Sequence, residues 1–172
     1  MRPAVVFGLL LLGGIFIAGC ASPLGPATLT ARDTPAAVTA GLSQVTYAHV
    51  ATIGKDWDTV PGNDGVVIYT DLVDKDQRSV LWEGPPLVAD VEIWTVQAGT
   101  EKLEIDDRLV YRGSANITSW RDGKILMGGG IRVPFSEIIV PDGKKTGRTR
   151  VTVHMPDGKT FTGITETTPL VP

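Results

Sequence analysis

The sequence is poor in the residues that most catalytic and metal sites need. Its 172 residues include one cysteine, Cys20, and two histidines, His49 and His154. A single cysteine excludes an intramolecular disulfide and the common structural zinc sites, which need at least two thiolates. The net charge of −3 argues against nucleic acid as a partner, because a phosphate-binding surface makes a domain basic. With no Gly-x-Ser-x-Gly elbow either, we expect a protein that is not an enzyme.

The N-terminus carries an apolar run. Arg2 gives the start of the chain one positive charge, and residues 4–18 contain no polar or charged side chain. As a helix, this run would be roughly 22 Å long, short of the roughly 30 Å hydrocarbon core of a bilayer. The pattern predicts a signal peptide over residues 1–19 rather than a permanent transmembrane helix.

The end of this run, Ile17-Ala18-Gly19-Cys20, resembles the lipobox of prokaryotic lipoproteins. The resemblance implies that signal peptidase recognises Ile17, Ala18 and Gly19 and cleaves before Cys20, whose thiol carries a covalent diacylglycerol. Two acyl chains bind a bilayer stably, whereas one binds only marginally. The implied partner is therefore the lipid bilayer. The alternative is an ordinary secretory leader that leaves Cys20 free.

The residues after Cys20 bear on location and on the tether. Ala21, in place of Asp, favours the outer membrane under the sorting rule of enteric-type bacteria. We therefore expect an exported protein, anchored to the outer face of the cell membrane or to the outer membrane. Residues 20–43 are rich in Ala, Thr, Pro, Gly and Ser, which predicts a flexible linker of roughly 25 to 30 Å. A short helix over residues 35–42 is the alternative.

From residue 45 onward, apolar and polar residues alternate between turn signals. Ala89, Val91 and Ile93 alternate with Asp90 and Glu92, as in an antiparallel sheet with one buried face. We expect strands at residues 45–53, 66–73, 79–83, 87–97, 102–105 continuing into 109–117, 131–135, 149–155 and 160–165.

The turn signals complete the fold prediction. Asp-Gly pairs end at Gly65, Gly123, Gly143 and Gly158, where glycine can take the positive φ of a tight turn, and residues 156–159 should close a hairpin. Residues 44–172 thus read as an all-β domain, an antiparallel β-sandwich of seven or eight strands. It resembles immunoglobulin and fibronectin type III domains in size and rhythm. Segments 128–138 and 151–161 are similar to segments of prokaryotic lipoproteins, a likeness that implies no activity.

One loop gathers oxygen ligands. Asp56, Asp58, Asn63 and Asp64 lie between two predicted strands, and Ca²⁺ prefers six to eight such oxygens. The EF-hand spacing fails, because Val60 stands where an acidic ligand should be. The alternative is that these residues form turns and carry solvated charges.

Three tryptophans are candidates for a binding platform. Trp94 shares a predicted face with charged residues, and Trp57 and Trp120 lie in predicted loops. Exposed indoles stack on sugars or anchor protein interfaces, although a sandwich often packs its tryptophans under loops. We therefore expect a non-catalytic binding or structural module of the cell envelope, whose partner is an envelope protein or a glycan. The alternative is a calcium- or carbohydrate-binding lipoprotein that uses the loop from Asp56 to Asp64.

Overall fold

The computed structural model describes residues 41–98 and 104–172, which belong to a compact unit running from Asp33 to Pro172. The described part holds seven strands: β1 (Tyr47–Lys55), β2 (Gly65–Val73), β3 (Glu83–Ala98), β4 (Glu104–Ser119), β5 (Ile131–Pro134), β6 (Thr146–His154) and β7 (Thr160–Pro169). Three single-turn 3-10 helices accompany them: η2 (Trp120–Gly123), η3 (Ile125–Met127) and η4 (Phe135–Glu137). Within these residues, no helix is long and apolar enough to cross a membrane.

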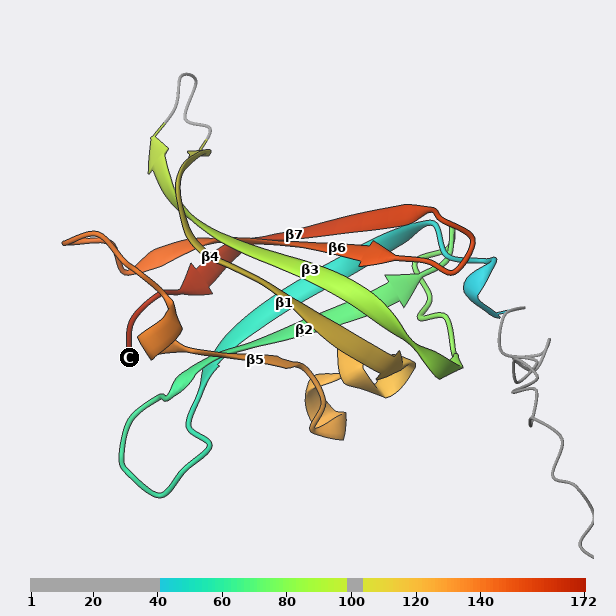
Figure 1. Ribbon diagram of the computed structural model, residues 1–172, viewed down its shortest axis with the longest axis horizontal. Coiled ribbons are helices and arrows are strands. Elements are labelled where there is room, and N and C mark those ends of the chain that lie inside the picture. Colours follow the sequence, from blue (N-terminus) through green and yellow to red (C-terminus); the bar gives the residue numbers. More distant parts are fainter. Residues whose placement is uncertain (1–40, 99–103) are drawn as a thin grey trace, which may run out of the picture. The chain divides into compact units, whose positions relative to one another are not determined.

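The strands form two antiparallel sheets, one of three strands in the order β1-β2-β5 and one of four in the order β4-β3-β6-β7. In Figure 1 the four-stranded sheet lies across the three-stranded sheet. The two sheets also approach each other at one edge, since a Cβ on Gly163 of β7 would lie 2.4 Å from the Ala48 carbonyl oxygen of β1. The fold is therefore β-sandwich-like, as the alternation predicted.

The core lies between the two sheets. Ile68 of β2, Ile93 of β3 and Val153 of β6 are fully buried in one apolar cluster, which also contains Trp82 and Leu170. Leu42 is 5 % exposed in this same cluster and stands before the predicted domain start at residue 44. Because the unit from Asp33 to Pro172 contains both sheets and their whole described core, it can fold as an independent domain.

Seven of the eight predicted strands are confirmed, with ends that differ by a few residues. The prediction of a separate strand over residues 79–83 was wrong. Only Ser79 forms a bridge, to Val73, and the chain then runs to β3, which begins at Glu83. Val80 and Trp82 are apolar because this connection crosses the core edge and buries both side chains. A buried segment can therefore show the apolar alternation of a strand without pairing as one.

The Asp-Gly pairs have two different roles. Gly158 has φ +84° and closes the β6–β7 hairpin, as predicted, and Gly143 is also left-handed at +81°. Gly65 and Gly123 lack a positive φ, so the turn prediction was wrong there. A Cβ on Gly123 would lie 2.5 Å from the Thr70 carbonyl oxygen. Glycine at residue 123 allows the backbone of η2 to lie directly on β2.

Candidate functional site

Four of the residues predicted to be functional, namely Ile17, Ala18, Gly19 and Cys20, lie outside the described residues, as does most of the predicted tether. The other predicted sites lie within the described domain. They fall in three places: the β1–β2 loop, the outer face of the four-stranded sheet, and η2.

The β1–β2 loop brings three of its four predicted ligands together. One carboxylate oxygen each of Asp56, Asp58 and Asp64 lie within 4.8 Å of one another. These carboxylates also bond the loop backbone: Asp64 Oδ2 accepts from the N–H groups of Trp57 and Asp58, at 2.6 and 3.1 Å. Asp58 Oδ1 accepts from the Val60 N–H at 2.6 Å. Such contacts are typical of aspartates that stabilise turns.

Asn63 and Trp57 point to other parts of the same loop. The Asn63 side chain lies over Gly54, where a Cβ would be 3.0 Å from its Nδ2. The Trp57 ring packs over Gly65, and the Arg132 guanidinium carbon lies 5.7 Å from the ring centre. Trp57 is therefore only partly exposed, with neighbours already in place.

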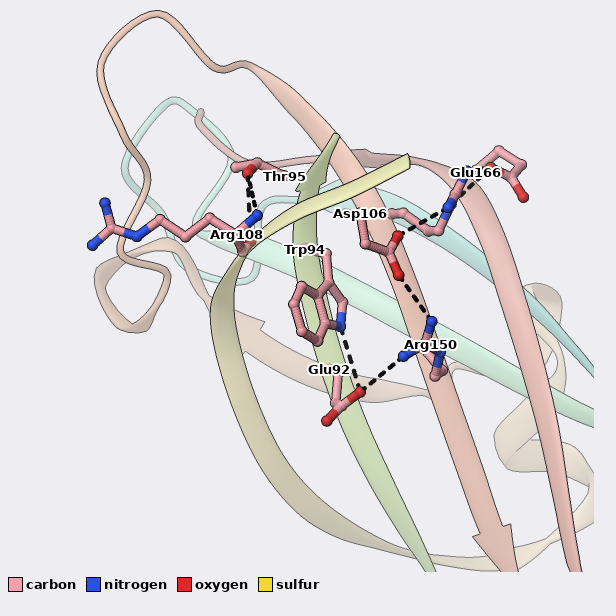
Figure 2. Close-up of polar contacts among 8 residues, drawn as sticks. Glu92, Trp94, Thr95, Asp106, Arg108, Arg150 and Glu166 are labelled. Atoms are coloured by element: carbon pink, nitrogen blue, oxygen red, sulfur yellow. Dashed lines mark hydrogen bonds and ion pairs between the residues drawn. The ribbon is translucent and has the colours of Figure 1, made fainter. Parts of the chain in front are cut away.

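Trp94 lies on the outer face of the four-stranded sheet, beside a β-bulge. The pairing of β3 with β4 shifts on both sides of this region, so that Asp107 and Arg108 oppose the single residue Thr95. The fully buried Thr95 Oγ1 accepts from the Arg108 N–H at 3.1 Å, which satisfies a backbone group that the bulge leaves out of the ladder (Figure 2).

Next to the bulge is an ion-pair network made by Glu92, Asp106, Arg112, Arg148, Arg150 and Glu166. Arg148 contacts Asp106 at 2.9 Å and Glu166 at 2.6 Å. Arg150 joins the other oxygen of Asp106, at 2.9 Å, to Glu92, at 3.3 Å, and Figure 2 shows this continuous chain of contacts. Arg112 completes the network with a 2.6 Å contact to Glu92. Three carboxylates therefore balance three guanidinium groups.

The electrostatics of this network favour the ionised forms of Glu92 and Arg148. Burial raises the pKa of Glu92, but hydrogen bonds from Arg112 and Trp94 and the charges of Arg112 and Arg150 outweigh it and hold this pKa below its ordinary value. Burial likewise lowers the pKa of Arg148, and its pairs with Glu166 and Asp106 reverse the effect and raise it. The pKa of the Glu92 carboxyl is thus shifted away from neutral pH, unlike that of a general acid or base.

Trp94 takes part in this network rather than standing free of it. Its indole N–H donates to Glu92 Oε2 at 3.4 Å, and the Arg150 guanidinium carbon lies 6.0 Å from the ring centre. The predicted platform residues thus lie on different elements, and each has an arginine over its ring, since Arg121 lies 5.2 Å from the Trp120 ring centre.

The two histidines lie on different sheets. His154 Nε2 contacts Asp90 Oδ2 at 2.7 Å, and Ser114 donates to Asp90 Oδ1 at 2.6 Å. These two bonds, Ser114 first, lower the pKa of Asp90. In a Ser-His-Asp triad the imidazole lies between the other two groups, whereas here the carboxylate does, and Ser114 donates to Asp90. His49 is exposed on β1, opposite Asp71 of β2.

Trp120 borders a cavity of about 420 Å³, named here the β2 cavity. Val66, Ile68 and Leu72 face the core, so Tyr69 and Asp71 face the opposite side of β2. Residues 120–130 cover this side, and the cavity is lined by residues of β1, of β2 and of the 120–127 segment. Its size falls within the ordinary range for small-molecule sites, roughly 300–1,000 Å³.

A polar cluster lines the cavity at β2. Lys124 Nζ donates to Asp71 Oδ2 at 2.5 Å and also contacts the Ser79 hydroxyl, and Ser79 donates to the same Asp71 oxygen at 2.6 Å. The second oxygen, Asp71 Oδ1, and the Tyr69 hydroxyl are both buried, and neither has a hydrogen-bond partner among the described residues. The Tyr69 side chain is 2 % exposed.

Comparison with protein-family models, curated proteins and solved structures finds no match to this chain. Its function must therefore be argued from its own residues.

Sequence reasoning did not find the β2 cavity. Asp71 stands among other aspartates near a strand end, and Tyr69 belongs to an uninterrupted apolar strand pattern. Lys124, which pairs with Asp71, is 53 residues away in the chain. The one local signal was the apolar run Ile125-Leu126-Met127, which lies between two predicted strands. The structure leaves all three side chains exposed, and an exposed apolar run of this kind is unusual outside a binding surface.

Proposed function

We propose that the protein is an exported, lipid-anchored lipoprotein of the cell envelope, whose β-sandwich is a non-catalytic binding module. The observation that carries this proposal is the single cysteine, placed directly after Ile17-Ala18-Gly19 at the end of an apolar run. A diacylglyceryl group on Cys20 would hold the chain at a membrane surface. The bilayer is then one partner, and an envelope protein, a glycan or a small ligand is the other.

The order of the strands supports a sandwich of the fibronectin type III kind within this proposal. In that fold the first, second and fifth strands form one sheet, and the fourth, third, sixth and seventh form the other. The same order occurs here. Domains of this architecture serve many unrelated roles, so the order supports a fold type and not an activity.

Two features of the described domain favour binding over catalysis. First, Asp90 lies between Ser114 and His154, whereas nucleophilic catalysis needs the imidazole in the middle. Second, the β2 cavity combines apolar walls with a few convergent polar groups, which is the usual composition of a ligand site.

The anchor is tested in a bacterial host by labelling with a radioactive fatty acid. Cys20→Ser should abolish labelling and leave a precursor that keeps the predicted leader, whereas the neighbouring control Ser22→Ala should be labelled and processed like the parent chain. Labelling that survives Cys20→Ser would refute the lipoprotein proposal.

A calcium- or carbohydrate-binding role at the β1–β2 loop is the second candidate. The close approach of the Asp56, Asp58 and Asp64 carboxylates favours it, and Trp57 lies in the same loop. Thermal unfolding in EDTA and in millimolar calcium tests the calcium part of this candidate.

A further inference from the structure

The β2 cavity offers two buried oxygen atoms that complement each other. Asp71 Oδ1 belongs to a carboxylate and can only accept a hydrogen bond, whereas the Tyr69 hydroxyl can donate one. Neither has a partner among the described residues, so no hydrogen bond joins them to each other. A buried polar group without a partner is costly, and natural proteins pair such groups with protein, water or ligand.

A hydroxyl group would satisfy both atoms at once. It can donate its proton to Asp71 Oδ1 and accept the proton of the Tyr69 hydroxyl. Tyr69 and Asp71 are two residues apart on β2 and point to the same side of the sheet, and both residues line the cavity.

The charge at the cavity favours a neutral ligand. Lys124 already pairs with Asp71 through Oδ2, so the carboxylate is neutralised by a residue of the protein itself. A cationic ligand would place a second positive charge beside the Lys124 ammonium, and an anionic ligand would approach the Asp71 carboxylate. A neutral donor avoids both repulsions.

The remaining walls are mostly apolar. Trp120, Ile125, Leu126 and Met127 line the cavity, and Leu126 is 95 % exposed at its rim. The volume of about 420 Å³ far exceeds the roughly 30 Å³ that a single water occupies. Such a site suits a ligand with a sizeable apolar body and few polar groups.

We propose that the β2 cavity binds a neutral, largely apolar small molecule through one hydroxyl group, which Tyr69 and Asp71 hold between them. This inference rests on the proposed binding role and names its ligand class. The lipid anchor is tested separately in cells, so loss of ligand binding and loss of the anchor are distinguishable outcomes.

The test uses the unit from Asp33 to Pro172 and a matched pair of probes, 4-propylphenol and 4-propylanisole. The two have nearly the same shape, but the anisole has no hydroxyl proton to donate. Titrations followed by amide NMR shifts give both the affinity and the place of binding. We expect 4-propylphenol to bind in the millimolar range or tighter and to shift amides of residues 69–71 and 120–127, and the anisole to bind at least about fivefold more weakly.

Variants identify the groups responsible. Tyr69→Phe should weaken 4-propylphenol binding about three- to tenfold, because it removes the hydroxyl that donates to the ligand oxygen. Leu126→Ser should weaken both probes. Its matched control, Leu81→Ser, changes another exposed leucine, which does not line the cavity, and should weaken neither. Unchanged amide shifts in β6 and β7 verify that each variant is folded.

Equal affinities for the two probes would overturn the proposal, because the hydroxyl would then have no role. Amide shifts confined to residues outside the cavity, or no shifts with either probe, would also overturn it and would indicate that water alone satisfies Tyr69 and Asp71. Full 4-propylphenol affinity in Tyr69→Phe would remove Tyr69 from the site.

Discussion

Replacing Tyr69 with phenylalanine should stabilise the folded domain, although most substitutions of fully buried residues destabilise. The Tyr69 ring packs beneath Gly130, where a Cβ would lie 3.1 Å from the ring atom Cε1, and phenylalanine keeps this packing. Only the buried hydroxyl is lost. Because it has no hydrogen-bond partner among the described residues, it gives up its bonds to water on folding and gains none in return.

The size of the effect follows from that lost hydration. A buried polar group without a partner costs about 1–3 kcal/mol, so the free energy of unfolding should rise by about 1–2 kcal/mol in Tyr69→Phe. For a domain of this size that corresponds to a midpoint increase of about 3–6 °C. Tyr47, which is 37 % exposed, supplies the control, and Tyr47→Phe should change the free energy of unfolding by less than about 0.5 kcal/mol.

The assay is urea and thermal unfolding of the unit from Asp33 to Pro172, without ligand. The sign of the change in the free energy of unfolding shows whether the Tyr69 hydroxyl has a hydrogen-bond partner in the folded domain. A decrease of about 1 kcal/mol in Tyr69→Phe would show that the Tyr69 hydroxyl makes a hydrogen bond in the ligand-free domain, and it would contradict the expected stabilisation. The variant would then be expected to lose a bridging water.

Two further predictions concern the outer face and the β1–β2 loop. Since the pKa of Glu92 in the folded protein lies below its ordinary value, its stabilisation is complete above about pH 4.5 and is lost as the pH falls through the folded-state pKa. Glu92→Gln should therefore lower the unfolding free energy by about 1 kcal/mol at pH 7 and by less at pH 3, in urea titrations, and equal losses at both pH values would contradict this. In the loop, Asp64→Ala should cost about 1–2 kcal/mol even in EDTA, because the Trp57 N–H loses its acceptor and the Asp58 N–H loses one of its two acceptors. Asp56→Ala should cost less, because it removes only the other acceptor of the Asp58 N–H. A cost that appears only in calcium would instead favour a metal site there.

The wrong predictions share a physical cause, which is contact between distant segments. Residues 79–82 have the composition of a strand because Val80 and Trp82 are buried, yet only Ser79 among them finds a strand partner. Gly123 stands in an Asp-Gly pair typical of a turn, but the chain needs glycine there because η2 lies against the Thr70 carbonyl. Local sequence does not distinguish these causes.

In the candidate sites too, some features follow from one short segment and others depend on how the chain folds. The carboxylates of the β1–β2 loop were predictable as neighbours, because they come from one short segment. The bonds that tie Asp64 to the Trp57 and Asp58 backbone were not, since they depend on how the loop folds back on itself. Trp94 was placed correctly on a charged face, but the arginine over its ring comes from β6.

The all-β class, most of the strands and the β6–β7 hairpin can be predicted from local sequence, because side-chain alternation and the φ preference of glycine act over a few residues. The apolar leader and the residues before Cys20 are also local patterns, and they carry the proposed anchor. Tertiary structure alone decided the order of strands in each sheet and the ion pairs across the outer face. It also decided the β2 cavity, where Lys124 reaches Asp71 across 53 residues and two buried oxygens remain without partners among the described residues. Such features depend on which surfaces meet when the sheets pack, and no short stretch of sequence encodes that meeting.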